Sequence, residues 1–159
     1  MKESTLQCHV ADYLRLRYPN AIFHSDYGSG AFLKESQKRT QARQNGYRKG
    51  WPDLFIAEGR GYFVTRGDKP PAFGNFICTV GETDLYICNG LFIELKRDGE
   101  RILKKKDLTY ASEHLEVQAK MLNELRTRGY AAFFAVGFDQ AKQIIDEYLG
   151  GPTNETVEF

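Results

Sequence analysis

The sequence predicts an α/β domain in which helices cover a small mixed β-sheet, with a β-rich insert between two of its strands. The order of the expected elements supports this class: a helix, a strand, a long β excursion, a strand, a helix, a strand and a helix. At 159 residues, 42% of them hydrophobic, the chain is long enough to close one core. We therefore expect a single domain over residues 1–151, followed by a disordered tail over residues 152–159.

The first expected helix spans residues 3–17, where apolar side chains recur at helical spacing until Pro19 ends the pattern. A short strand over residues 21–24 and a polar helix over residues 32–45 follow. Residues 54–57 are continuously apolar and predict a short buried strand. The first half of the chain therefore alternates helix and strand.

Residues 59–90 form the expected insert, because glycines and Pro70-Pro71 separate several β-favouring runs there. Asn89-Gly90 joins two such runs and is a strong signal for a two-residue hairpin. We therefore expect the strand that carries Glu94 to pair antiparallel with the strand before it.

After this strand, residues 97–110 show no sustained helical period and predict a polar loop. Ser112 is the expected N-cap of a helix that runs to Arg128. Residues 130–136 are almost wholly apolar, as in a strand covered on both faces, and Asp139 is the expected cap of the last helix.

Composition excludes several classes of protein. No apolar stretch approaches the roughly 20 residues that a membrane helix requires, so no membrane partner is expected. Cys8, Cys78 and Cys88 are odd in number and lack CxxC spacing, which argues against a structural zinc site or a disulfide framework. This cysteine usage favours a cytoplasmic location.

Positive charge is concentrated in two segments, although the formal net charge is only +1. Local basic patches on a neutral chain are typical of proteins that bind a polyanion. Ordinary solvated surface explains either segment equally well when it is taken alone. The residues expected to contact a DNA backbone are Lys34, Lys38, Arg39, Arg43, Arg48, Lys49, Arg97, Lys104 and Lys105.

Three charged residues at strand ends carry the main functional signal. Asp53 stands at the entrance of one expected strand, and Glu94 and Lys96 stand at the end of another. Glu94 and Lys96 are two residues apart, so they face the same side of a strand while Leu95 points into the core. Two carboxylates and an ammonium are what metal-dependent phosphodiester cleavage requires, with Mg²⁺ or Mn²⁺ as the metal. Taken separately, a Pro-Asp turn and alternating strand charges are both common; together they predict a nuclease site.

Two further polar residues fit this interpretation. Gln118 lies between Leu115 and Leu122 on the inward stripe of its expected helix, where an amide must be hydrogen-bonded. It either orients the charged site or lies at the edge of the stripe and bonds to solvent. Glu3 either lends an outer carboxylate to the metal or reflects the preference of acidic residues for the first turn of a helix.

Together these residues resemble the virus-type replication-repair nuclease (VRR-Nuc) domain, a branch of the PD-(D/E)XK, restriction-endonuclease-like superfamily. The resemblance spans residues 3–149. It implies a restriction-endonuclease-like core and a metal held by Asp53, Glu94 and the main-chain carbonyl of Leu95. The motifs that carry it are Gly50-Trp51-Pro52-Asp53, Phe92-Ile93-Glu94-Leu95-Lys96, the helical glutamine Gln118 and the acidic Glu3 of the first helix.

The resemblance further implies a divalent-metal-dependent DNA endonuclease with Lys96 as the motif lysine. Stand-alone members, commonly from phages and bacteria, look like homodimers that act on branched DNA such as four-way junctions in DNA repair. Two alternatives stay open: a non-catalytic DNA-binding or assembly module on the same fold, and a phosphodiesterase that acts on RNA. Dimer and monomer also stay open, because a dimer suits paired cuts in a junction and a monomer suits flaps or nicks.

Overall fold

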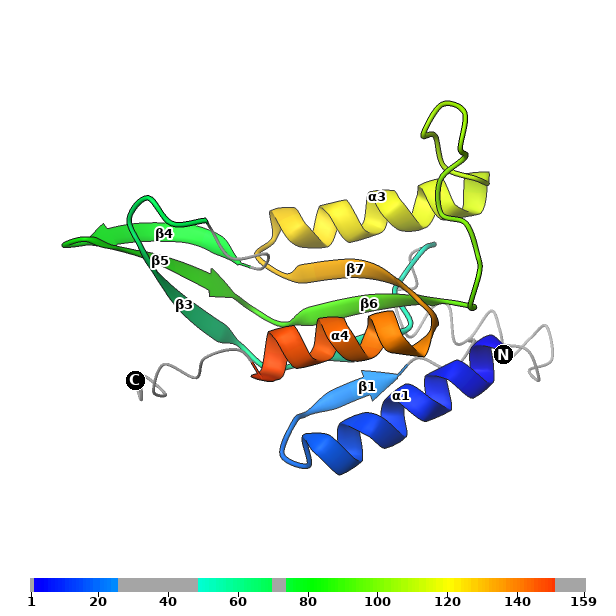
Figure 1. The fold of residues 1–159 in the computed structure, drawn as a ribbon, viewed down its shortest axis with the longest axis horizontal. Coiled ribbons are helices and arrows are strands. Elements are labelled where there is room, and N and C mark those ends of the chain that lie inside the picture. Colours follow the sequence, from blue (N-terminus) through cyan, green and yellow to red (C-terminus); the bar gives the residue numbers. More distant parts are fainter. Residues whose placement is uncertain (1, 26–48, 70–73, 151–159) are drawn as a thin grey trace.

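The computed structural model describes residues 2–25, 49–69 and 74–150, and these form a helix-covered sheet from which a second sheet projects (Figure 1). The expected helix over residues 32–45 and the expected tail over residues 152–159 lie outside the described residues. Within the described ranges, no helix combines the length and the apolar composition that crossing a bilayer requires.

The main sheet has four strands in the order β1-β2-β6-β7. β1 pairs antiparallel with β2, β2 pairs antiparallel with β6, and β6 pairs parallel with β7. The parallel pair requires a crossover, which the helix between β6 and β7 provides. This sheet is mixed, as predicted, and its strands are β1 (Phe23–Ser25), β2 (Leu54–Ile56), β6 (Leu91–Lys96) and β7 (Ala131–Val136).

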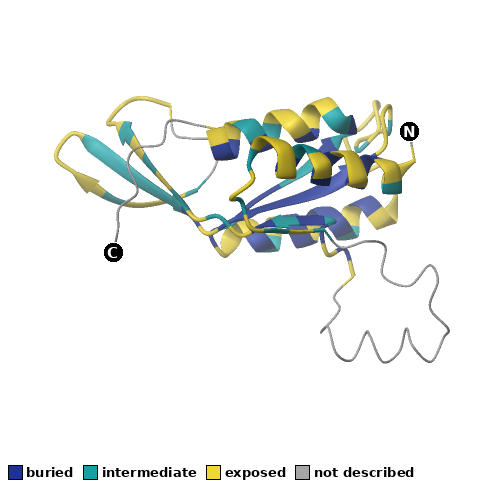
Figure 2. Ribbon diagram, turned by 90° about the horizontal axis from the view of Figure 1, so that it is seen from below, coloured by how far each residue is buried: buried dark blue, intermediate teal, exposed yellow. Residues whose placement is uncertain are grey.

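Helices cover both faces of this sheet. α1 (Glu3–Arg17) and α4 (Gly137–Gly150) pack on one face, and α3 (Glu113–Thr127) packs on the other. All six residues of β6 are buried, and the strand lies between the two helical layers in Figure 2. Its odd-numbered apolar residues join the core under α1 and α4, whereas Phe92 joins the cluster under α3. Because side chains alternate along a strand, Glu94 and Lys96 face the α3 side.

For the three helices that the structure describes, the predicted bounds agree well, with one exception. α1 begins and ends as expected, and the Ser112 hydroxyl caps α3 by accepting a hydrogen bond of 3.2 Å from the amide of Leu115. The expected cap at Asp139 is wrong, because α4 begins two residues earlier, at Gly137. Gly137 has a φ of 79°, which turns the chain from β7 directly into the helix. The side chain of Gln140 accepts from the amide of Val136 at 2.6 Å, and Asp139 lies in the first turn.

The insert is β-rich, as predicted, and forms a three-stranded antiparallel sheet in the order β3-β5-β4. This sheet projects from the body of the molecule as an arm (Figures 1 and 2). Much of its surface is open to solvent, and Phe63, Phe76, Ile77 and Val80 are each about half exposed or more. Its strands are β3 (Arg60–Thr65), β4 (Asn75–Val80) and β5 (Thr83–Cys88).

The predicted hairpin at Asn89-Gly90 is wrong, because β5 and β6 belong to different sheets and do not pair. Asn89 instead donates to the carbonyls of Arg128 and Gly129 at the end of α3, at 3.2 and 2.8 Å. A Cβ at Gly90 would lie 2.8 Å from the ring of Phe55, so glycine is required for close packing against β2. The dipeptide therefore carries the chain from the arm into the main sheet.

Candidate active site

The sheet register brings Asp53 and Glu94 together. The antiparallel pairing of β2 and β6 ends at Leu54 opposite Ile93. One further step in the same register places Asp53 opposite Glu94. Beyond this point β2 no longer covers the edge of β6, and the amide of Leu95 donates to the Asp53 carboxylate at 2.8 Å. The site therefore forms where the two strands separate.

Glu3, in the first turn of α1, supplies a third carboxylate. One carboxylate oxygen from each of Glu3, Asp53 and Glu94 lies within 4.8 Å of the other two. The three residues come from α1, the entrance of β2 and β6, which are distant in sequence. Three oxygen donors at this spacing are the ligand type that Mg²⁺ and Mn²⁺ prefer.

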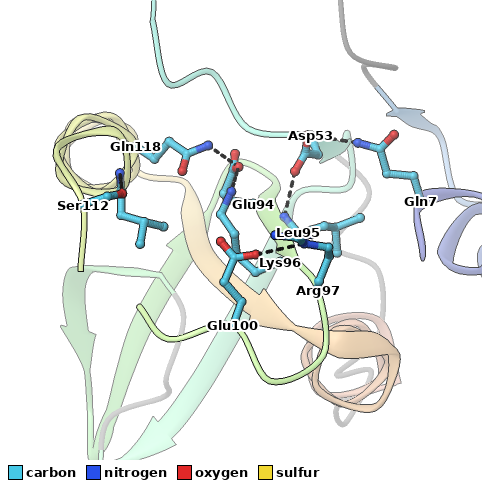
Figure 3. A network of polar contacts seen from close by, with 10 residues as sticks. Gln7, Asp53, Glu94, Leu95, Lys96, Arg97, Glu100, Ser112 and Gln118 are labelled. Atoms are coloured by element: carbon cyan, nitrogen blue, oxygen red, sulfur yellow. Dashed lines mark hydrogen bonds and ion pairs between the residues drawn. The ribbon is translucent and has the colours of Figure 1, made fainter. Parts of the chain in front are cut away.

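Hydrogen bonds fix both oxygens of Asp53 (Figure 3). Gln7, on α1, donates to Oδ1 at 2.9 Å, and the amide of Leu95 donates to Oδ2. Burial raises the pKa of Asp53 to about 6; the Leu95 amide opposes this shift, and the negative charge of Glu3 adds to it. Without a cation, the site therefore holds its negative charge at an energetic cost.

Glu94 is only 2% exposed and forms the centre of a buried polar network. Its Oε1 accepts from the Lys96 ammonium at 2.7 Å and also from the side-chain amide of Gln118, on α3 (Figure 3). Burial raises the pKa of Glu94 to about 8; the charge of Asp53 adds to the shift, and that of Lys96 opposes it. The carboxylate form therefore requires more positive charge than Lys96 alone provides.

The donors fit a divalent metal. Glu94 Oε2 is buried and has no hydrogen-bond partner among the described residues, whereas Oε1 of the same carboxylate accepts two hydrogen bonds. A buried carboxylate oxygen without a partner destabilises a protein unless something compensates its charge. A cation among Glu3, Asp53 and Glu94 would provide that compensation and favour the ionised forms of Asp53 and Glu94.

The segment before Asp53 is packed tightly against α3 and β6. Gly50 has a φ of 81°, and a Cβ there would lie 3.0 Å from the carbonyl oxygen of Val117 and 3.1 Å from the Cα of Gln118. Trp51 packs edge-on against Phe92 of β6, with ring centroids 5.5 Å apart. These contacts explain why glycine and tryptophan precede the carboxylate, and they connect the segment that carries Asp53 to the helix that carries Gln118.

The structure brings the expected catalytic and metal residues together, and it describes four of the nine expected DNA-contacting residues. Among the latter, Lys49, Arg97, Lys104 and Lys105 are exposed. Arg97 pairs with Glu100 at 3.5 Å. The remaining five expected contacts, Lys34, Lys38, Arg39, Arg43 and Arg48, lie outside the described residues.

Gln7 is the one residue of this cluster to which no role was assigned from the sequence. It lies one turn after Glu3 on α1, is 7% exposed, and is the only polar residue among the buried residues of that helix. Its position next to Leu6 on the inward stripe was a usable signal, of the same kind that indicated Gln118. Its partner was not predictable, because α1 reaches Asp53 only in the folded chain.

No protein-family model matches the sequence, and no curated protein matches it significantly. A solved structure described as a VRR_NUC domain protein is similar, with a TM-score of 0.53 and 20% sequence identity. The similarity covers 94% of this chain and 89% of that chain. The chain therefore has the fold of a VRR_NUC domain protein, as the resemblance predicted.

Proposed function

We propose that this chain is a divalent-metal-dependent endonuclease that hydrolyses DNA phosphodiester bonds at the cluster of Glu3, Asp53 and Glu94. The observation that supports this most strongly is the convergence of three carboxylates, one of them with a buried, unpartnered oxygen, next to a buried lysine. The similarity to a VRR_NUC domain protein supports it independently at the level of the fold.

Each residue has a separate role in the proposed reaction. Asp53 and Glu94 would bind Mg²⁺ or Mn²⁺ with the Leu95 carbonyl, and Glu3 would add an outer carboxylate. A divalent metal there supplies a Lewis acid for the phosphate oxygens and lowers the pKa of a bound water. Gln118 holds the Glu94 carboxylate in place. Lys96 lies on the same face of β6 as Glu94 and would stabilise the negative charge that develops on the phosphate.

The proposed substrate is DNA with a branch, such as a four-way junction. Four exposed basic residues could contact the phosphate backbone of DNA: Lys49, Arg97, Lys104 and Lys105. The affinity of such contacts depends on the salt concentration and not on the base sequence. The preference for branched DNA and a homodimer with two active sites follow from the family resemblance. A two-fold dimer would present two sites to the two-fold symmetry of a junction.

A cleavage assay with labelled DNA tests this proposal. Four-way junction, flap, duplex and single-stranded DNA would each be incubated with Mg²⁺, Mn²⁺ or EDTA. We expect metal-dependent products from the wild type, with the junction cut fastest, and no products from Glu94→Ala. Glu147→Ala, which removes an exposed carboxylate on α4, is the matched control and should cleave like the wild type.

Two results would overturn the assignment. Cleavage by purified Glu94→Ala at the wild-type rate would exclude this cluster as the active site. DNA binding by the wild type without cleavage under any metal would instead identify a DNA-binding module on a nuclease fold. RNA of the same shape, included in parallel, separates a DNA enzyme from a general phosphodiesterase.

A further inference from the structure

The loop between β6 and α3 ends in a small hairpin that is held together by its own hydrogen bonds. The amide of Lys104 donates to the carbonyl of Thr109 at 2.7 Å, and the amide of Ala111 donates to the carbonyl of Ile102 at 2.9 Å. Leu103 and Tyr110 form a β-bridge across the hairpin. This tip loop, residues 102–111, is therefore a defined structure.

Leu108, in the turn of this tip loop, is unusual in two respects. Its φ is 56°, and among the described residues it is the single non-glycine residue with a positive φ. Its side chain is also 73% exposed. A leucine is disfavoured in this backbone conformation, and an exposed apolar side chain contributes little to folding. A strained residue that does not stabilise the fold is a candidate for a functional contact.

Three lysines precede Leu108 in the tip loop. Lys104, Lys105 and Lys106 are all exposed, and none of them forms an ion pair with a described residue. The one acidic residue of the tip loop, Asp107, is already engaged, because its Oδ1 accepts from the amide and the hydroxyl of Thr109 at 3.1 and 2.8 Å. The tip therefore presents an apolar point next to three exposed ammonium groups, of which Lys104 also interacts with the charge of Asp107.

The tip loop projects from the end of the molecule that contains the candidate active site. In Figure 1 it extends beyond the first turn of α3, at the same end as the close of β6 and the start of α1. Leu103, Leu108 and Tyr110 line one groove with the outer face of α3, and Glu113, Glu116 and Lys120 of that helix line it too. Glu116 is paired with Lys120 at 2.7 Å. DNA that continues from the carboxylate cluster beyond the first turn of α3 would reach this loop.

We propose that Leu108 is a wedge that inserts between neighbouring bases of bound DNA, while Lys104, Lys105 and Lys106 contact the adjacent phosphates. Proteins that kink DNA use apolar side chains, leucine among them, to unstack one base step, and basic residues to hold the backbone on each side. This inference rests on the proposed function, because it takes DNA as the ligand. It assigns Leu108 the task of unstacking one base step of the bound DNA.

A second copy of the chain is the other conceivable occupant of this surface, and charge disfavours it. Two tip loops in symmetric contact would bring six lysines together against two copies of Asp107, each of which already accepts hydrogen bonds from Thr109. The phosphates of DNA can pair with the lysines, and its stacked bases offer an apolar surface to Leu108. The combination of the two features therefore favours DNA.

Fluorescence of 2-aminopurine tests the wedge directly, because this base becomes brighter when it loses its stacking partner. It would be placed in turn at each position around the branch of a four-way junction and titrated with the full chain in EDTA, so that no cleavage occurs. We expect the fluorescence to rise by about twofold or more at one or two positions with wild type.

Leu108→Asn should bind the junction within about threefold of the wild-type Kd yet abolish the rise in fluorescence. Asparagine accepts the left-handed backbone conformation but provides no apolar wedge. Leu108→Met should retain the rise.

Leu16→Asn is the matched control, since Leu16 is 85% exposed on α1, outside the tip loop, and this variant should behave like the wild type. Lys105→Gln should weaken binding and reduce the salt dependence by about one phosphate contact. An unchanged rise with Leu108→Asn, or no rise with saturating wild type, would overturn the wedge. So would a change from dimer to monomer in Leu108→Asn, which would identify the tip loop as a subunit contact.

These outcomes are separable from those of the proposed function. Cleavage of DNA by wild type without any rise in fluorescence overturns the wedge alone. A rise that Leu108→Asn abolishes, in a chain that cleaves no DNA with any metal, supports the wedge and overturns the nuclease activity. Absence of DNA binding overturns both.

Discussion

The side chain of Gln7, on α1, holds the carboxylate of Asp53 in position. Its amide donates to one oxygen of Asp53 while the amide of Leu95 donates to the other, so the carboxylate is held from both sides. Groups that hold a metal ligand in this way set its orientation and its affinity for the metal. The position of Asp53 is thus controlled by α1 as well as by the strand that follows it.

Replacement of Gln7 by leucine tests this role. Gln7→Leu keeps much of the side-chain volume but removes the donor to Asp53 Oδ1, so the ligand is no longer oriented. We expect Mn²⁺ affinity, measured by calorimetry, to fall about tenfold or more. Gln143→Leu is the matched control, because Gln143 donates to Glu147 at 2.8 Å on the exposed face of α4. Equal Mn²⁺ affinities of Gln7→Leu and Gln143→Leu would exclude the positioning role.

Gly50 connects two elements, the segment before β2 and the helix α3. The chain approaches the backbone of α3 so closely at this point that no side chain fits without a shift. Because Gln118 lies at the same point of the helix, the approach also sets the distance between the elements that carry Asp53 and Gln118. The packing of these elements is therefore part of the construction of the site.

Gly50→Ala should both destabilise the fold and weaken the site. The added Cβ would meet the Val117 carbonyl at 3.0 Å, in a backbone conformation that alanine disfavours. Gly67→Ala shares the positive φ, but nothing lies within 4 Å of its added Cβ, so it measures the backbone cost alone. We expect Gly50→Ala to lower the free energy of unfolding by about 1–3 kcal/mol more than Gly67→Ala, as measured in urea. Equal losses would mean that the close approach is unimportant.

Local patterns predicted the elements better than their connections. The bounds of α1, the cap of α3, the loop after β6 and the strand β7 follow from helical spacing, a capping serine and an apolar run. Asn89-Gly90 was misleading because the same dipeptide serves a tight turn and a close crossing between two sheets. Asp139 was misleading because a glycine two residues earlier starts the helix, with the side chain of Gln140 as the acceptor for Val136.

The candidate site was predictable where residues share one strand, and less so where elements meet. Glu94 and Lys96 follow from strand alternation alone, and their contact is present in the structure. That Asp53 lies opposite Glu94 depends on the register of β2 and β6, which no local pattern determines. The contact of Gln7 with Asp53 depends on how α1 docks, which tertiary packing alone determines.

The buried carboxylates of Asp53 and Glu94 make the free energy of unfolding of the whole molecule depend on pH. The pKa of Glu94 is about 8 in the folded chain, against an ordinary value of 4.5. Between these values the folded state keeps a proton that the unfolded state has released. The free energy of unfolding therefore falls as the pH rises through this window. The stabilising contribution is complete below the ordinary pKa and is lost above about 8.

Urea unfolding in EDTA measures this dependence. We expect the stability of the wild type to decline from about pH 5 to about pH 8, and Glu94→Gln to decline less, because it no longer titrates. Saturating Mn²⁺ should oppose the decline, since metal binds the ionised carboxylates and stabilises the folded state more at higher pH. A wild-type profile in EDTA that matches that of Glu94→Gln would contradict the raised pKa.

The proposed DNA cleavage depends on the carboxylate cluster and on a divalent metal. Single-turnover cleavage of a labelled four-way junction, with wild type and Asp53→Asn in Mn²⁺ and in EDTA, tests it most directly. We expect cleavage from wild type in Mn²⁺ only, and a rate for Asp53→Asn lower by about a hundredfold or more, with junction binding retained. Cleavage by Asp53→Asn at the wild-type rate would exclude Asp53 from the reaction, and wild-type cleavage that persists in EDTA would exclude a divalent metal.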